Sequence, residues 1–360
     1  MLLGSEGWGE EERRQLAALA AQSALTPAAA SGQGWLGIPT GGSGGRLKLA
    51  RHDEETIGAA VRGFAAHFGL SRVNAAGVLP LHHVSGLMAW MRCALTGGEY
   101  RPLEWKRVEA GAEPRLGDRP EGWTLSLVPT QLERLLRAER TIEWLRQFRI
   151  IFVGGAPSSS PLLDRAAALQ LPVSLGYGMT ETAAMLTGQQ PREFLAGMRH
   201  AGSALPHARV SIDERGGIIV GGESLFRGYW PDWREGDLLT EDSGRLDDAG
   251  RLHVLGRRDA VIITGGEKVN PAEVEQALRQ TGEFPEVVVA GLPDAEWGQV
   301  VVAAFPGSAR PDLAKVNESL GRSLAPAKRP KRFVPLPDWP VTEQGKVNRA
   351  EVVRRIGELN

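Results

Sequence analysis

The stretch VSLGYGMTET, residues 173–182, decides the fold of this chain. Its first three residues have the composition of a buried strand, and the seven that follow place an aromatic ring, a hydroxyl and a carboxylate within one turn. This set suits a nucleotide: Tyr177 could stack on a base, Thr180 could donate to a phosphate, and Glu181 could hold magnesium, which prefers oxygen ligands. Alone, Glu181 fits better as a carboxylate at a helix N-terminus, so it is the combination that favours a nucleotide site.

Strands and helices alternate on both sides of this stretch. We expect buried strands at 75–81, 124–128 and 149–153, and helices at 53–68, 87–95, 129–138 and 161–169. This alternation predicts an α/β fold whose mostly parallel sheet is covered on both faces. Ligands of such sheets bind at the carboxyl ends of the strands, where the glycine turn 154–156 and the 173–182 stretch both lie.

The pattern changes in the last part of the chain. Short strands separated by turns predict an antiparallel β-subdomain over about 205–257. Beyond it, a compact α/β domain is expected, with strands at 261–263, 286–290 and 300–305 and a helix at 271–280. We therefore expect an N-terminal core over 1–257 and a C-terminal domain over 258–360.

A second stretch, IPTGGSGGRLK at residues 38–48, combines glycines, hydroxyls and two cations. Small residues let backbone N–H groups converge on an anion, while Thr40 and Ser43 add hydroxyl donors and Arg46 and Lys48 add positive charge. Its spacing fits neither the standard P-loop nor the dinucleotide-binding turn. On these residues alone, a phosphate-binding loop and a flexible Gly/Ser linker are equal alternatives.

Composition limits the classes of protein. A chain of 360 residues predicts two or three domains, and a formal net charge of -1 gives no overall field for nucleic acid or an acidic membrane surface. The only cysteine, Cys93, excludes an internal disulfide and is expected as a small core residue. No long uncharged apolar run is present and the N-terminus is acidic, so we expect a cytoplasmic protein without a membrane span.

From about Gly37 to Arg349 the chain resembles the adenylate-forming superfamily of acyl-CoA synthetases, nonribosomal-peptide adenylation domains and luciferases. The segments that carry the resemblance follow the family's order: 40–48, 80–86 (PLHHVSG), 154–156, 177–182, 240–242 (TED), 256–259 (GRRD) and 340–347 (PVTEQGKV). The resemblance implies a large N-terminal domain with a mostly parallel sheet and a β-subdomain, then a small mobile C-terminal α/β domain. It also implies a fold shortened at the N-terminus, because only about forty residues precede the phosphate loop.

The resemblance implies roles for the matching residues. The residues that would bind ATP are Thr40, Gly41, Gly42, Ser43, Gly44, Gly45, Lys48, Gly154, Gly155, Ala156, Tyr177, Gly178, Met179, Asp242 and Arg257. The catalytic residues would be Lys346, Thr180, His83 and Glu181, and Glu181 would also hold Mg²⁺. Asp259 would be the hinge of the C-terminal domain, and Gly265 and Gly266 would line a channel for coenzyme A (CoA).

The resemblance also implies which residues form the ribose site. A carboxylate and an arginine across a hairpin could grip the two ribose hydroxyls, with a surface ion pair as the alternative. The distance to Arg257 selects Asp242, and not Asp237, as the ribose carboxylate. The neighbouring Glu241 replaces a glycine of the family pattern, and we expect its side chain to point away from ATP.

The implied reaction has two halves. A substrate carboxylate attacks the α-phosphate of ATP beside Lys346; the C-terminal domain then pivots at Asp259, and a thiol attacks the acyl-adenylate. The loop and the 83–86 segment look most like the o-succinylbenzoate-CoA ligases of menaquinone and phylloquinone synthesis, particularly the compact cyanobacterial type. The alternatives are a ligase that loads another aryl or fatty acid onto CoA or a carrier protein, and a nucleotide-binding regulatory module without turnover. The oligomeric state is open, a homodimer included.

Candidates for the acid pocket follow the expected strand 75–81. His83 and Ser85 could contact a second carboxylate of the acid, whereas Arg92 fits better as a solvated helix residue. His82 and His83 suggest a metal site, but neighbours at a strand end are expected to point apart, and no third ligand is evident. The basic run 328–332 has three interpretations: a solvated loop, a nucleic-acid or targeting patch, and a contact for CoA phosphates, which the resemblance favours.

Overall fold

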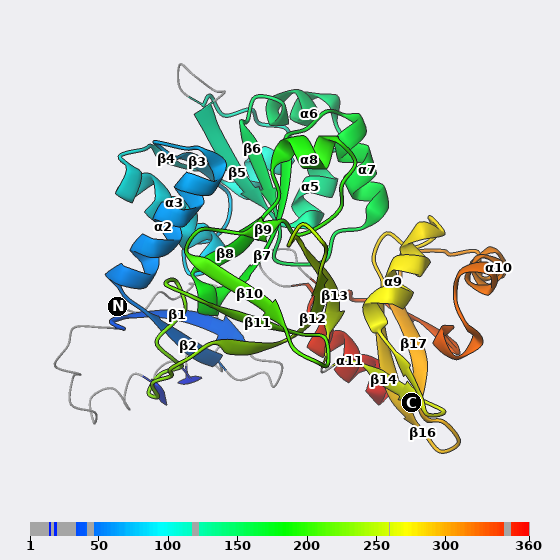
Figure 1. Cartoon of the computed structure of the whole chain (residues 1–360). Coiled ribbons are helices and arrows are strands. Elements are labelled where there is room, and N and C mark those ends of the chain that lie inside the picture. The colour runs from blue at the N-terminus through cyan, green and yellow to red at the C-terminus, as the bar shows by residue number, and fades with distance from the viewer. Residues whose placement is uncertain are drawn as a thin grey trace.

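The computed structural model describes residues 14–15, 18–19, 34–41, 47–116, 122–258, 260–341 and 347–359 (Figure 1). Within these ranges, no helix has both the length and the apolar character needed to cross a membrane.

A seven-stranded sheet lies at the centre of the N-terminal part, in the order β4-β3-β5-β6-β7-β8-β9 (Figure 1). Its parallel strands are β4 (Tyr100–Pro102), β3 (Asn74–Gly77), β5 (Trp123–Leu127), β6 (Ile150–Val153) and β7 (Val173–Met179). The antiparallel strands that follow are β8 (Ala184–Gly188) and β9 (Ser203–Ala204). The predicted mostly parallel sheet is thus confirmed.

Helices cover both faces of this sheet. On one face are α2 (Glu54–Phe68) and α3 (Val84–Thr96), whose Phe64 and Cys93 share a core cluster with Phe152 of β6. The other face carries α4 (Trp105–Glu109), α5 (Pro129–Leu135), α6 (Glu139–Leu145), α7 (Ser160–Ala168) and α8 (Pro191–Leu195). The helix expected at 129–138 is shorter than predicted, because α5 ends at Leu135; α6, which begins at Glu139, was not predicted.

The 173–182 stretch differs from its prediction in one respect: β7 continues to Met179 and does not end at residue 175. Only then does a single 3-10 turn follow, Thr180–Thr182. The continuation depends on glycine, since a Cβ on Gly178 would overlap the carbonyl oxygen of Ala184 on β8. The register of the β7–β8 pair shifts between Tyr177 and Gly178, so the stretch does not alternate strictly between the two faces of the sheet.

Two smaller antiparallel units border the sheet. Strands β1 (Leu36–Gly41) and β2 (Leu47–His52) form a hairpin in which Thr40 lies opposite Lys48. The predicted β-subdomain contains β10 (Ala208–Ile212), β11 (Gly217–Gly222), β12 (Leu238–Leu246) and β13 (Leu252–Arg257), all antiparallel. The glycine-rich stretch 38–48 thus spans the tip of a hairpin, and its central residues 42–46 lie outside the described ranges.

The C-terminal part has its own five-stranded sheet. Its strands are β14 (Ile262–Thr264), β15 (Glu267–Val269), β16 (Val288–Asp294), β17 (Gly298–Pro306) and β18 (Arg332–Leu336). Its helical elements are α9 (Pro271–Gln280), α10 (Leu313–Ser323), the 3-10 turn Pro326–Lys328 and α11 (Arg349–Glu358). Separate apolar clusters form on the two faces of this sheet, so this part has a core of its own. The domain boundary at 257/258 stays a prediction.

Candidate active site

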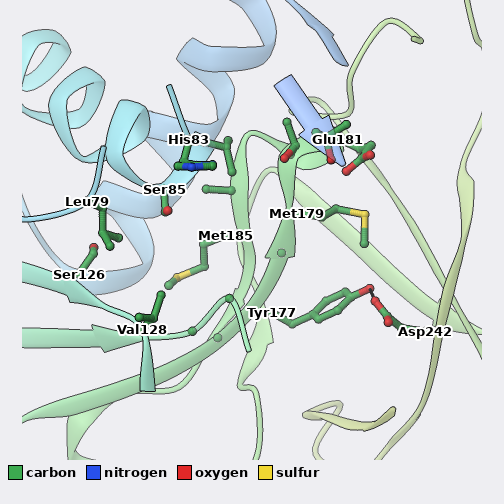
Figure 2. A pocket seen from close by; sticks show the side chains of 18 of the residues that line it. Leu79, His83, Ser85, Ser126, Val128, Tyr177, Met179, Glu181, Met185 and Asp242 are labelled. Carbon is green, nitrogen blue, oxygen red and sulfur yellow. Dashed lines mark hydrogen bonds between the residues drawn. The ribbon is translucent and has the colours of Figure 1, made fainter. Parts of the chain in front are cut away.

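A cavity of about 680 Å³ opens at the carboxyl ends of β5, β6 and β7. Many of the predicted site residues line it: Thr40, Lys48, His83, Ser85, Gly154, Gly155, Tyr177, Gly178, Met179, Thr180, Glu181, Asp242 and Arg257. In Figure 2, Glu181, Met179 and Asp242 lie on one side of this cavity, while His83, Ser85 and Ser126 lie on the other. Segments far apart in the sequence thus meet in one pocket.

Other predicted residues stand elsewhere. Gly41 ends β1, and Ala156 follows Gly155 without lining the cavity. Gly265 and Gly266 form the positive-φ turn between β14 and β15. Outside the described ranges lie Gly42, Ser43, Gly44, Gly45, Asp259 and Lys346, for which the predicted roles stay predictions.

The turn after β7 is held by a dense set of hydrogen bonds. The Thr182 hydroxyl accepts from the backbone N–H of Met179 at 3.0 Å. The backbone carbonyl of Thr180 lies 2.8 Å from the buried His52 Nε2. Burial lowers the pKa of His52 to about 4, so at neutral pH this ring is uncharged and donates Nε2–H to that carbonyl. Thr180 and Glu181 therefore stand on a fixed backbone.

The ribose end of the cavity lies between β7 and the β-subdomain. Asp242 and Arg257 face each other in the β12–β13 register, as the hairpin prediction requires. The Tyr177 hydroxyl donates to Asp242 Oδ2 at 2.7 Å (Figure 2). Burial, and then the charge of Asp242, raise the pKa of Tyr177, so its hydroxyl stays a donor. This end therefore has a carboxylate held in place by a phenol.

The sequence predicts that the Glu241 side chain points away from ATP, but the structure gives it a specific partner. It forms an ion pair with Arg257 beside the cavity, and the two opposite charges offset each other. The predicted repulsion between Glu241 and ATP is thereby reduced, because the carboxylate already has a cationic partner.

Glu181 marks a different corner of the cavity. Its side chain is buried, with 7% of its surface exposed, and one carboxylate oxygen accepts from the Tyr229 hydroxyl at 2.5 Å. In the described part of the chain, no lysine or arginine forms a salt bridge with it, and no three His, Cys, Asp or Glu side chains gather into a metal site. A lone buried carboxylate on a cavity fits Mg²⁺, which takes one or two protein carboxylates and completes its shell with phosphates and water.

Arg92 corrects a prediction. Instead of lying on a solvated helix face, it lines the cavity, is only 5% exposed, and has its guanidinium carbon 3.7 Å from the centroid of the Phe64 ring. Burial lowers its pKa to about 9, so it remains a cation at neutral pH. Its Nε has no hydrogen-bond partner among the described residues. A buried cation on the wall of a cavity, with a donor left unpaired, favours an anionic ligand group.

The histidine segment begins α3. His83 precedes the helix, and a Cβ on Gly86 would overlap the Pro80 carbonyl oxygen, which explains the glycine at that spacing. The expectation that His82 and His83 point apart is wrong, because their rings lie with centroids 4.2 Å apart. At the start of α3 the backbone of Gly86 packs closely against that of Pro80, so the two histidines lie in a turn and not at the end of an extended strand.

Several cavity residues escaped the sequence analysis. Tyr229, Met185 and Ser126 line the pocket, and His52 supports it from outside. Tyr229 lies 48 positions after Glu181 in the chain and reaches it only because the chain returns beside β2. Its local sequence carries no chemical signal, so only the fold reveals it.

Two further predictions concern residues outside the cavity. Cys93 is buried in the core as expected, and burial raises the pKa of its thiol to about 11. In the basic run, Lys328 forms an ion pair with Glu273, and Arg329 donates to the backbone carbonyl of Leu324. Lys328 and Arg329 therefore already have partners within the C-terminal part of the chain.

Comparison with protein families identifies the class. The family model "AMP-binding enzyme" matches residues 8–230, and the model "AMP-binding enzyme C-terminal domain" matches residues 273–346. Since the first match alone covers more than half of the chain, this chain belongs to the AMP-binding enzyme family, the adenylate-forming enzymes.

Individual relatives agree with this. The 2-succinylbenzoate–CoA ligase of Listeria monocytogenes serotype 4b is 31% identical over 284 residues, which are 77% of this chain and 60% of the relative. The structure of o-succinylbenzoate CoA synthetase from Bacillus subtilis, solved with its acyl-adenylate intermediate OSB-AMP, superposes with a TM-score of 0.76 at 28% identity, over 88% of this chain and 68% of that chain. The same Bacillus subtilis enzyme in complex with ATP and magnesium ion gives a TM-score of 0.75 at 26% identity, over 88% and 69% of the two chains. The chain spans about three fifths of the length of the curated relatives it matches.

Proposed function

We propose that this chain is an ATP-dependent acid–CoA ligase that converts 2-succinylbenzoate into its CoA thioester through an acyl-adenylate. The observation that carries the proposal is that one cavity contains both the nucleotide residues Tyr177, Glu181 and Asp242 and the buried Arg92. The solved relative from Bacillus subtilis with OSB-AMP supports the same chemistry.

The nucleotide side of the cavity explains how ATP would be positioned. The Asp242 carboxylate, held by the Tyr177 hydroxyl, is placed to accept from ribose hydroxyls. Thr40 and Lys48 face each other on the hairpin, so one hydroxyl and one cation are available to the phosphates. Mg²⁺, bound by Glu181 and the phosphates, would supply charge neutralisation for the departing pyrophosphate. Lys346 is proposed to stand between the acid and the α-phosphate.

The acid side explains the choice of substrate. 2-Succinylbenzoate has two carboxylates, of which only one is activated. We assign the other to Arg92, whose buried guanidinium lines the cavity and whose Nε has no partner among the described residues. Ser85 and Ser126 add hydroxyls, and Leu79, Phe152 and Met185 add apolar wall for the aromatic ring. An acid without a second carboxylate would leave the buried cation unpaired, which costs about 1–3 kcal/mol or more.

The second half-reaction would take place after the C-terminal part pivots at Asp259. Gly265 and Gly266 would then approach the cavity and line the path of the CoA thiol, which attacks the acyl-adenylate and releases AMP. The proposal includes a cytoplasmic location, where ATP and CoA are both supplied, and no nucleic-acid partner.

A panel of acids tests the proposal. AMP release is measured with 2-succinylbenzoate, benzoate, a fatty acid and no acid, each with and without CoA. We expect release that requires both the acid and CoA and is fastest with 2-succinylbenzoate. Equal rates with benzoate or a fatty acid would favour another acyl-CoA ligase, and nucleotide binding without any AMP release would favour a regulatory module.

A further inference from the structure

Tyr229 lines the cavity but has no part in the reaction described above. Its hydroxyl donates to Glu181 Oε1 at 2.5 Å, so that oxygen is already used. We propose that Tyr229 is a positioning residue: it holds one oxygen of the Glu181 carboxylate and thereby aims the other at the divalent cation that accompanies ATP. This inference rests on the proposed function, because it assumes that Glu181 is a metal ligand.

The position of Tyr229 is fixed by backbone pairing with the hairpin. The Arg51 N–H donates to the Gly228 carbonyl at 3.0 Å, and the Trp230 N–H donates to the Leu49 carbonyl at 2.9 Å. An ion pair between Arg227 Nε and the buried Asp53 carboxylate, at 2.8 Å, adds a third link. The phenol therefore approaches Glu181 from a rigid frame and not from a mobile loop.

The same segment also holds the backbone of Glu181. The Phe226 N–H donates to the Glu181 carbonyl at 2.8 Å, while His52 contacts the preceding residue, Thr180. Since these bonds fix the main chain without the phenol, the contribution left to the Tyr229 hydroxyl is the direction of the carboxylate. A phenol facing a carboxylate can only donate, so the Tyr229 hydroxyl is the donor of this bond.

The ring of Tyr229 has a second contact that links it to the phosphate end. Lys48 Nζ lies 4.7 Å from the ring centroid, and Phe226 packs against the ring with centroids 4.8 Å apart. A Tyr229→Phe substitution would keep both ring contacts and remove only the hydroxyl. It therefore isolates the bond to Glu181.

Metal binding by the full chain tests the assignment directly. Free Mn²⁺ is titrated by electron paramagnetic resonance in the presence of ATP, with wild type and Tyr229→Phe. Hydrogen-bond partners of metal ligands typically affect metal affinity by about 10–100-fold. We expect Mn²⁺ binding in the ATP complex to weaken by about tenfold or more, while ATP affinity without metal changes less than about twofold, because the nucleotide contacts elsewhere are unchanged.

Tyr177→Phe is the matched control, since it removes the same group from the ribose end of the same cavity. We expect it to weaken ATP binding equally with and without metal. Unchanged Mn²⁺ affinity in Tyr229→Phe, or a metal-independent loss of ATP binding, overturns the inference.

A double variant separates positioning from a role in folding. In a Glu181→Gln background, adding Tyr229→Phe should cause no further loss of Mn²⁺ affinity, because the carboxylate it would aim is gone. A further loss would show that the hydroxyl supports the fold and not the metal ligand. If wild type itself shows no ATP-dependent Mn²⁺ binding, the proposed function of this site fails, which is a different outcome.

Discussion

The two sides of the cavity differ in how their polar groups are satisfied. On the nucleotide side, Asp242 and Glu181 each accept from a tyrosine, and Arg257 is paired with Glu241. On the acid side, Arg92 is buried against Phe64, and its Nε has no partner among the described residues. Paired groups are already oriented before ATP arrives, whereas an open buried cation gains its partner only with the correct acid. The difference suggests that one side supplies the common chemistry and the other supplies the specificity.

The largest effect is expected at the residue that the resemblance places between the two sides. Removal of one preorganised electrostatic donor costs about 10²–10³ in rate. Lys346→Ala should therefore nearly abolish acyl-adenylate formation, measured by pyrophosphate exchange, and spare thioester formation from a supplied adenylate. Equal loss of both half-reactions would contradict the role given to Lys346.

Arg92→Gln should act on the acid side alone. Loss of a hydrogen bond to a charged group costs about 1.5–3 kcal/mol, or roughly 10–100-fold in kcat/KM for 2-succinylbenzoate. The KM for ATP in pyrophosphate exchange should stay within about twofold of wild type, because the nucleotide contacts remain intact. A comparable rise in the KM for ATP would mean that the two sides are not separate.

The pH dependence sharpens the same distinction. Burial lowers the pKa of Arg92 from its usual value, but a guanidinium stays protonated over the pH range in which an enzyme is assayed. In wild type, the preference in kcat/KM for 2-succinylbenzoate over benzoate should therefore stay constant from about pH 6 to about pH 9. A preference that falls with rising pH would mean that a group other than Arg92 holds the second carboxylate.

Tyr177→Phe should give the smallest effect. It removes one neutral donor from Asp242, worth about 1 kcal/mol, so the Kd for ATP should rise about fivefold with no change in the Kd for the acid. Calorimetric titration with ATP measures it. If binding of the acid weakened more than binding of ATP, Tyr177 would belong to the acid side of the cavity and not to the nucleotide side.

The sequence predicted the fold well, because alternating strands and helices leave a clear pattern. Helix α9 begins and ends where it was expected, at Pro271 and Gln280. The β7 extension was missed because glycines usually end strands, and here Gly178 is needed so that β8 can come close. The strand expected at 75–81, in contrast, is shorter than predicted and ends at Gly77.

The site was predicted in part, for a similar physical reason. Residues of contiguous segments, such as Tyr177 and Glu181, could be found because their side-chain types and spacing carry the chemistry. Tyr229 and the burial of Arg92 could not, because they depend on how distant segments pack. From sequence alone, Arg92 is expected on a solvated helix face; only the fold shows that it packs against the Phe64 ring.

The most direct test of the account compares two acids in two proteins. The acids are 2-succinylbenzoate and its monoester at the carboxylate that is not adenylated, which keeps the reacting group but lacks one charge; the proteins are wild type and Arg92→Gln. The account predicts that wild type prefers the diacid by about tenfold or more in kcat/KM and that the variant has almost no preference. An equal preference in both proteins would contradict the claim that Arg92 recognises the second carboxylate.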